Sequence, residues 1–251
     1  MRSAGKAAAW SAMGSWVGLV GSTLSLVVLA RLLDPTDFGI YGLLLVTLAI
    51  PEAITSESLN ESLIQRPDLT GGHSNSVFGL SLLFAIAFFV GIFFAGPYIE
   101  DFFKQDGLNT YLSVMSIGLF LGAFTLVPAG HLQRRLEFKQ IALVDVIGTV
   151  TAAIIGVVFA ILLHNAWALI IMELSRRFVR MVAFCWFDRW WPSLRFSLRN
   201  MRDLAAYNFA TVGVRLVSVI EISIPRAVVG IYLGPAALGM MNLALRVQEQ
   251  A

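Results

Sequence analysis

The sequence RLLDPTDFGIYGLLL, residues Arg31–Leu45, places a short polar turn between two long apolar runs. A related sequence, IYLGPAALGMMNLAL, occurs 200 residues later at Ile231–Leu245. At this constant offset the identical pairs are Leu33/Leu233, Pro35/Pro235, Gly39/Gly239, Leu43/Leu243 and Leu45/Leu245. We predict that each stretch is a helix–turn–helix hairpin and that the hairpin is used twice. In the first copy, Asp34-Pro35 is expected to form the turn and Asp37 to cap the second helix.

The composition excludes a water-soluble globular domain. Of the 251 residues 57% are hydrophobic and 14% charged, and the mean hydropathy is +0.77. Soluble domains carry about 25% charged residues. None of the apolar runs alternates strictly with polar residues, as the strands of a membrane barrel do. The sequence therefore predicts an all-α integral membrane protein, and its single cysteine, Cys185, excludes an internal disulfide.

The length of the apolar runs predicts the number of membrane spans. A helix needs about 20 mainly apolar residues to cross the hydrocarbon core. The first run is longer than the apolar core of a signal peptide, about 7–15 residues, so we expect it to be a span. The predicted spans are Ala7–Leu33, Phe38–Leu63, Val77–Gly96, Leu108–Gly130, Ile141–Leu163, Ala166–Phe187, Leu204–Leu233 and an eighth that begins near Ala236.

Lysine and arginine predict the orientation, because cytoplasmic loops carry an excess of both. With a cytoplasmic N-terminus, most of the 18 basic residues fall on the cytoplasmic side, whereas only Arg31 and Lys104 fall on the outer side. In this assignment Arg176, Arg177 and Arg180 count with the cytoplasmic loop that follows the sixth span. The acidic segment Pro97–Gly107 is then an outer loop.

The spans and charges predict three regions. Residues 1–187 form an N-terminal lobe of six helices, residues 188–203 a cytoplasmic linker, and residues 204–251 the start of a second lobe. Arg195, Arg199 and Arg202 recur at helical spacing in the linker, which is typical of a basic amphipathic helix at the lipid headgroups; an ordinary basic loop is the alternative. Both hairpins then open a lobe and turn on the outer side. Parallel repeats of this kind bind substrate between the lobes, near mid-membrane.

Three stretches resemble the polysaccharide exporters, the Wzx-like oligosaccharide flippases of the multidrug/oligosaccharidyl-lipid/polysaccharide superfamily. They are LARLLDPTDFGIYGLL (residues 29–44), LIQRPDLTGGHSNSVF (63–78) and HLQRRLEFKQIALVD (131–145). The resemblance covers essentially the whole chain and is nearest to the colanic-acid and teichuronic-acid exporters. Members of that family are longer, so the resemblance implies a partial chain.

The resemblance also implies a function. It implies a MATE-like bundle in the bacterial inner membrane that moves a polyprenyl-diphosphate-linked oligosaccharide from the cytoplasmic to the outer leaflet by alternating access. The oligosaccharide is an O-antigen, exopolysaccharide or capsule repeat unit. Its partners would be this substrate, membrane lipids, and glycan polymerases or glycosyltransferases of the same pathway, but no nucleic acid. No cofactor and no enzymatic activity are expected.

Three alternatives stay open. The first is a small-molecule or drug exporter of the same superfamily. The second is a membrane-bound glycosyltransferase or polymerase, which needs a large loop with catalytic carboxylates. The third is a membrane component of glycan assembly without transport of its own. The sequence contains no phosphate loop, no GxSxG motif and no DxD motif to favour the second.

Ionisable side chains within the spans are the candidate site residues, since each costs about 2.5–3.5 kcal/mol to insert. We expect Arg215 and Arg226 to attract the diphosphate, because guanidinium binds phosphate through paired donors. The other expected cavity residues are Glu221, Glu52 and Glu57, although Glu221 alternatively neutralises one of the arginines. Residues expected either to bind a coupling ion or to snorkel to water are Glu61, Asp145 and Glu173.

No catalytic residue and no metal site are expected. The histidines His73, His131 and His164 have no cysteine or carboxylate at ligand spacing, so each is expected to be solvated at the end of a span. Pro51 and Pro225 lie in the middle of predicted spans and predict kinks in these helices.

Overall fold

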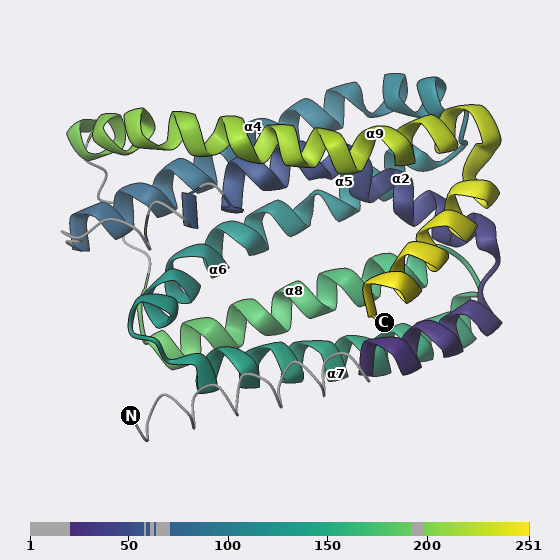
Figure 1. Cartoon of the computed structure of the whole chain (residues 1–251), viewed down its shortest axis with the longest axis horizontal. Helices are drawn as coiled ribbons and strands as arrows, with labels where there is room; N and C mark the ends of the chain where they lie inside the picture. Colours follow the sequence, from purple (N-terminus) through teal and green to yellow (C-terminus); the bar gives the residue numbers. More distant parts are fainter. Residues whose placement is uncertain (1–20, 58, 61–62, 64–70, 192–197, 251) are drawn as a thin grey trace.

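The computed structural model describes residues 21–57, 59–60, 63, 71–191 and 198–250, and all regular secondary structure among them is helical. A helix over Gly21–Leu32 comes first. It is followed by α2 (Pro35–Glu52), the π-helix η1 (Ala53–Glu57), α4 (Gly71–Phe103), α5 (Leu108–Met115), α6 (Ile117–Arg134), α7 (Phe138–Leu163), α8 (Trp167–Asp188) and α9 (Leu198–Gln250) (Figure 1). The predicted all-α bundle is confirmed.

Five helices in the described part of the chain are long and apolar enough to cross a membrane. They cover Pro35–Ser56, Gly72–Phe103, Leu108–Arg134, Phe138–Leu163 and Val212–Leu245. Three features account for the difference between this count and the predicted seven spans and partial eighth. The described part of the first span is short, α8 carries four charged residues between Glu173 and Arg180, and the predicted seventh and eighth spans lie within α9.

The helices are arranged in two layers that α6 connects. Figure 1 shows α2, α4 and the part of α9 before Gly234 along one side and α7 with α8 along the other. Helix α6 contacts α4 on one side and α8 on the other, while α9 packs chiefly on α2. We call the end with the turns at Asp34 and Gly107 the Asp34 end. The opposite end, where α6 ends at Arg134, is the Arg134 end.

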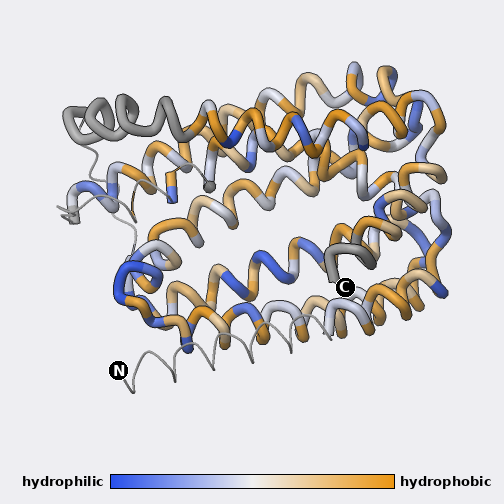
Figure 2. Tube along the Cα trace, in the orientation of Figure 1, coloured by the Kyte–Doolittle hydropathy of each residue, from blue (hydrophilic) through white to orange (hydrophobic). Residues whose placement is uncertain are grey.

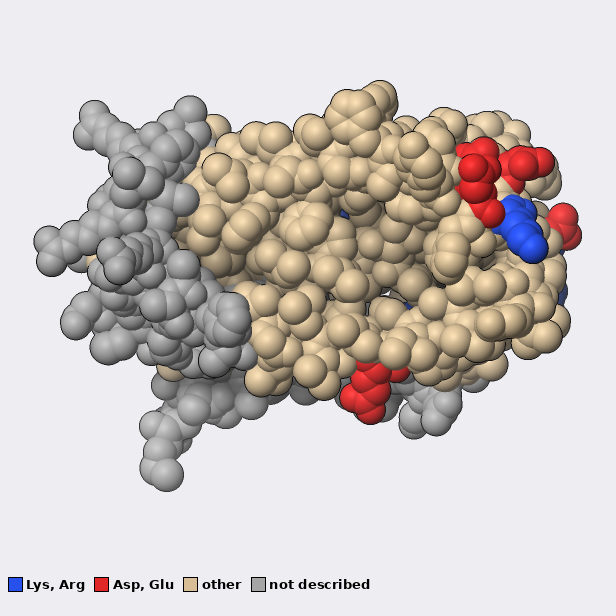
Figure 3. All heavy atoms as spheres, turned by 90° about the horizontal axis from the view of Figure 1, so that it is seen from above, with Lys and Arg blue, Asp and Glu red and all other residues tan. Residues whose placement is uncertain are grey.

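The outer surface of the bundle is apolar between its two ends. Helix α7 exposes large side chains such as Ile154 and Leu162, whereas its opposite face buries small residues, among them Ala152 and Ala160. Figure 2 shows α7 as mostly hydrophobic along its length. In Figure 3 most charged side chains in view gather at the Asp34 end, beside a broad face with few charges. This distribution suits helices surrounded by lipid, with small residues where helices touch.

The two repeated stretches form comparable turns. In the first, Asp34 is the N-cap of α2, Pro35 takes the first helical position, and the Asp37 carboxylate accepts a hydrogen bond from the Asp34 N–H at 3.1 Å. Asp37 is therefore part of a capping box rather than the predicted N-cap. In the second, α9 breaks at Gly234, whose φ of 80° and ψ of 173° suit glycine, and Pro235 resumes the helix.

Two predicted loops are shorter than expected. Helix α4 continues through Pro97 to Phe103, so the outer loop shrinks to residues 104–107. The Glu100 carboxylate closes this turn by accepting hydrogen bonds from the N–H groups of Gly107 and Asn109, at 3.2 and 2.8 Å. After α8 ends at Asp188, α9 already begins at Leu198, so the second half of the predicted linker belongs to a long helix. Arg195 lies outside the described residues.

A histidine joins three helices at the Arg134 end, so the expectation that His131 is merely solvated is wrong. On α6, His131 Nδ1 lies 2.7 Å from Asp188 at the end of α8, and its Nε2 lies 2.9 Å from the hydroxyl of Ser74 on α4. Arg135 adds a 3.0 Å ion pair to Asp188, whose side chain is fully buried. A buried carboxylate requires such partners.

Candidate functional site

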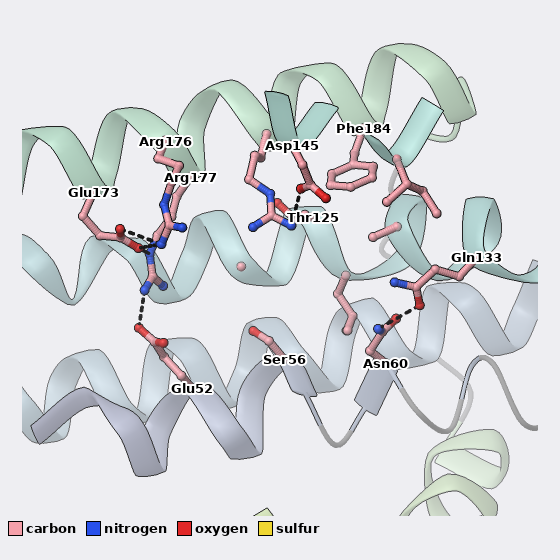
Figure 4. A pocket seen from close by; sticks show the side chains of 15 residues that line it. Glu52, Ser56, Asn60, Thr125, Gln133, Asp145, Glu173, Arg176, Arg177 and Phe184 are labelled. Carbon is pink, nitrogen blue, oxygen red and sulfur yellow. Dashed lines mark hydrogen bonds and ion pairs between the residues drawn. The ribbon is translucent and has the colours of Figure 1, made fainter. Parts of the chain in front are cut away.

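A polar cavity of about 460 Å³ lies between α2, η1, α6, α7 and α8. Its charged lining residues are three carboxylates and three arginines: Glu52, Asp145, Glu173, Arg176, Arg177 and Arg180. Among its uncharged polar residues are Ser56, Asn60, Thr125 and Gln133. Figure 4 shows these side chains pointing toward one another from helices on opposite walls. A polar cavity inside a membrane bundle is where ionisable groups are tolerated and where substrates pass.

The arginines are paired with carboxylates in the described structure. Glu173 holds two of them from one turn away on α8, with distances of 2.7 Å to Arg176 and 2.8 Å to Arg177. Arg177 also reaches across to Glu52 on α2 at 2.7 Å (Figure 4). Tyr41, also on α2, lies with its hydroxyl 3.5 Å from Glu173. These contacts tie α2 to α8 through charge.

The charged pairs differ in burial. The side chain of Glu173 is 4% exposed, whereas those of Glu52 and Asp145 are 28% and 48% exposed. Asp145 on α7 pairs with Arg180 on α8 at 3.1 Å. The two bridges between helices are therefore the accessible ones, whereas the carboxylate of Glu173 is enclosed by its own helix and its neighbours.

Glycines make room for these polar side chains. A methyl group at Gly118 on α6 would lie 3.2 Å from the Arg177 stem, and one at Gly122 would lie 2.8 Å from the Ser56 hydroxyl. On α7, a methyl group at Gly148 would lie 2.8 Å from the Arg180 stem. Small residues let membrane helices approach closely. Here they also admit long side chains between the helices.

The part of the cavity toward the Arg134 end is lined by amides instead of charges. The Asn60 Nδ2 donates to the Gln133 side-chain oxygen at 3.2 Å. The Asn60 Oδ1 is buried and has no hydrogen-bond partner within the described residues, and the same holds for Arg180 Nε. One atom is an acceptor and the other a donor. A ligand hydroxyl satisfies either kind of atom.

A widened helical turn shapes one wall of the cavity. Pro51 lies within α2, and the π-helix η1 begins two residues later at Ala53. The Thr55 hydroxyl donates to the Pro51 carbonyl at 2.7 Å, and the Ser81 hydroxyl of α4 donates to the Thr55 carbonyl at 2.6 Å. Such π-bulges often occur at functional sites. A kink was predicted at Pro51; the structure has a π-helical turn directly after it, and Ser56 of the cavity wall belongs to this turn.

The structure brings some of the predicted site residues together and leaves others apart. Glu52, Asp145 and Glu173 line the cavity. Arg215, Glu221 and Arg226 lie on α9 and are not among its lining residues; Glu221 is exposed and the two arginines are half-buried. The side chain of Glu57 and all of Glu61 lie outside what the structure describes.

The sequence reasoning missed the arginines of α8 as site residues. It counted Arg176, Arg177 and Arg180 with a cytoplasmic loop because positive charge marks the cytoplasmic side. Their spacing from Glu173, three, four and seven residues, contained the signal that was overlooked. Positions at such intervals share one helix face, so opposite charges there point to a paired, inward-facing stripe.

Comparisons with known proteins agree on one family. A family model described as "Polysaccharide biosynthesis protein" matches residues 28–250. The chain is 24% identical to the lipopolysaccharide biosynthesis protein WzxC of Escherichia coli, a match that covers 96% of this chain and 49% of that protein. It is 26% identical to the succinoglycan biosynthesis transport protein ExoT of Rhizobium meliloti, over 94% of this chain and 48% of ExoT.

A third relative has a similar coverage. The chain is 20% identical to the teichuronic acid biosynthesis protein TuaB of Bacillus subtilis, over 96% of this chain and 50% of TuaB. The chain thus spans about half the length of the curated relatives it matches. No solved structure matches it.

Proposed function

The chain belongs to the polysaccharide biosynthesis protein family, and we propose that it forms the N-terminal part of a flippase for lipid-linked oligosaccharides. The substrate is a polyprenyl-diphosphate-linked repeat unit that moves from the cytoplasmic to the outer leaflet. No bond is made or broken in this step. The observation that carries the proposal is the arginine-lined cavity within a bundle of apolar helices.

The arginine cluster suits the diphosphate of such a substrate. Arg176 and Arg177 project from adjacent positions on α8 into one cavity, where guanidinium groups bind phosphate oxygens through paired hydrogen bonds. Their present partners balance their charge, so binding an anion requires an exchange of partners. Glu52 is the carboxylate to be displaced, because it is partly exposed and reaches Arg177 from another helix. Glu173 stays in place as the buried anchor of both arginines.

The amide-lined part of the cavity suits the glycan. Asn60 and Gln133 offer donors and acceptors to hydroxyl groups, and Ser56 and Thr125 lie between them and the charged cluster (Figure 4). Sugars are recognised by such hydrogen bonds. The exposed apolar flanks of the bundle leave the polyprenyl tail in the bilayer.

The sidedness follows from the charge distribution of the sequence. We assign the Asp34 end to the outer face and the Arg134 end to the cytoplasmic face of a bacterial inner membrane. The sugar-binding amides then lie nearer the side where the repeat unit is assembled. Polymerases and glycosyltransferases of the same pathway are the expected partners at the membrane.

A flipping assay in proteoliposomes that contain the protein as cells produce it tests this proposal. Arg177→Ala removes charge-assisted hydrogen bonds worth about 1.5–3 kcal/mol each, so we expect the initial rate to fall by roughly ten- to a hundredfold. Arg31→Ala, a charge removal on the exposed surface at the Asp34 end, is the control and should leave the rate unchanged.

Two outcomes of that assay would contradict the proposal. One is wild-type transport by Arg177→Ala. The other is export of a cationic dye without any flipping of the lipid-linked substrate, which would favour the drug-exporter alternative. Arg215→Ala and Arg226→Ala, tested in parallel, decide whether the arginines of α9 also serve the substrate.

A further inference from the structure

The two repeated hairpins contact each other through their own repeated residues. A methyl group built on Gly39 of α2 would overlap the backbone carbonyl of Pro235 in α9. A methyl group built on Gly239 would overlap the backbone carbonyl of Pro35. Each contact is the counterpart of the other at the 200-residue offset of the sequence repeat. We call this contact, made by Pro35, Gly39, Pro235 and Gly239, the seam.

The reciprocity of the seam defines a local two-fold relation. In a two-fold contact, residue i meets residue j while the counterpart of j meets the counterpart of i. Positions on the axis meet their own counterparts. Gly239 approaches the backbone nitrogen of Gly39, and Gly42 lies against the side chain of Asn242. The axis between the repeats therefore passes through the crossing of α2 and α9.

The seam brings two helix backbones into direct contact. Its contacts are backbone against backbone. Beside it, Asn242 Nδ2 is buried without a hydrogen-bond partner in the described part of the chain. A buried donor left unpaired costs free energy. The described spanning part of α9, Val212–Leu245, is otherwise little buried.

The helix that makes the seam also reaches the cavity. Two residues after Gly39, the buried Tyr41 places its hydroxyl 3.5 Å from Glu173. At the other end of α2, Glu52 pairs with Arg177. An anion that takes Arg177 from Glu52 therefore removes the charged contact between α2 and α8 and leaves the contact between Tyr41 and Glu173. A rigid helix with two alternative arrangements transmits such a change to its other end.

We propose that the seam is the seal of the substrate path at the Asp34 end, and that it parts about the local two-fold axis when the path opens on that side. That a substrate path lies behind the seam rests on the proposed function. That the seam closes this end of the molecule rests on the reciprocal glycine contacts. Gly39 and Gly239 are then positioning residues that allow the two repeats to close on each other.

The test introduces a wedge into the seam and measures access to the cavity. Cys185 is replaced by serine, and a single reporter cysteine is placed in the cavity wall as Ser56→Cys. Whole cells are treated with a membrane-impermeant maleimide. We expect Gly39→Ala, and equally Gly239→Ala, to raise labelling of the reporter from outside by about tenfold, since the added methyl group disfavours the closed arrangement.

Matched controls are available in the same chain. A methyl group added at Gly91 on α4 or at Gly213 on α9 meets nothing within 4 Å. Gly91→Ala and Gly213→Ala should therefore leave labelling at the parent level. The amount of folded protein is measured for each variant by size-exclusion chromatography in detergent.

Three results would overturn the proposal. The first is unchanged labelling in both seam variants at normal protein levels. The second is an equal rise in the control variants. The third is loss of folded protein in both seam variants, because the contact would then be a permanent part of the fold. The measurement needs no substrate, so its failure is distinguishable from a failure of the flipping assay.

Discussion

The cavity carboxylates differ in what each contributes to the fold. Glu173 is 4% exposed and is enclosed by two arginines and Tyr41, whereas Asp145 is 48% exposed and pairs with one arginine. A buried ion pair that loses one partner leaves an uncompensated charge in a low-dielectric environment. A partly exposed pair is screened by water and contributes little.

We therefore expect Glu173→Gln to lower the free energy of unfolding by about 3–5 kcal/mol. Asp145→Asn, the matched neutralisation in the same cavity, should cost less than about 1 kcal/mol. Thermal unfolding in detergent, followed by tryptophan fluorescence, compares the two midpoints. Equal midpoints in both variants would show that Glu173 is not the anchor of the cluster.

If the substrate diphosphate displaces Glu52 from Arg177, removing the charge of Glu52 should change substrate binding. Glu52→Gln removes the charge that competes with the substrate for Arg177, while the buried Glu173 stays in place. We expect the variant to bind a water-soluble diphosphate analogue about tenfold more tightly, and to flip the lipid-linked substrate more slowly because release is impeded. Isothermal titration of purified protein measures the first effect; weaker binding of the analogue would contradict the displacement of Glu52.

At the scale of the element, the π-helical turn after Pro51 depends on a hydrogen bond from a neighbouring helix. Ser81 of α4 is fully buried and donates to the Thr55 carbonyl at 2.6 Å, within η1. Ser218 on α9 offers a matched control, since its exposed hydroxyl donates to a carbonyl of its own helix at 3.2 Å.

We expect Ser81→Ala to destabilise the protein by about 1–3 kcal/mol, because a buried carbonyl loses its donor. Ser218→Ala should stay within about 0.5 kcal/mol of the parent protein. The same thermal unfolding measurement compares them. If Ser218→Ala lowered the midpoint as much as Ser81→Ala, the turn would not depend on the contact with α4.

Elements differ in how far the sequence predicts them. The apolar runs that became α2, α4, α6 and α7 are apparent because length and hydropathy alone decide whether a helix can cross a bilayer. The ends of these helices are less apparent. Helix α4 continues past the apolar run to Phe103, where the Glu100 carboxylate accepts hydrogen bonds from the turn that follows the helix. Helix α8 was predicted as a span, but its charged stripe was assigned to a loop.

The cavity was only partly predictable for a related reason. Glu52, Asp145 and Glu173 stand out in the sequence because charged residues are rare in membrane spans. In the structure all three line the same cavity. Which helix supplies the opposite charges depends on how the helices pack, and that is set by glycines such as Gly118 and Gly148. A hydropathy pattern contains no information about which glycine faces which arginine.

At the scale of the whole molecule, the two copies of the repeated sequence contact each other in the structure. The pairs Pro35/Pro235 and Gly39/Gly239 are spaced by a constant offset in the sequence, and in the structure they meet in crossed pairs. That correspondence between sequence and contact is not required by the family match. In the structure the second copy of the hairpin packs directly against the first.

The orientation of the molecule in the membrane can be tested directly. Positive charge at the Arg134 end and acidic turns at the Asp34 end predict that the Arg134 end lies in the cytoplasm. Single cysteines are introduced into a Cys185→Ser parent, as Asp106→Cys in the 104–107 turn and Lys139→Cys at the start of α7. We expect an impermeant maleimide added to intact cells to label the first and to leave the second unlabelled until the cells are permeabilised. Labelling of Lys139→Cys from outside would invert the bundle, and with it the direction in which the cavity and the seam serve transport.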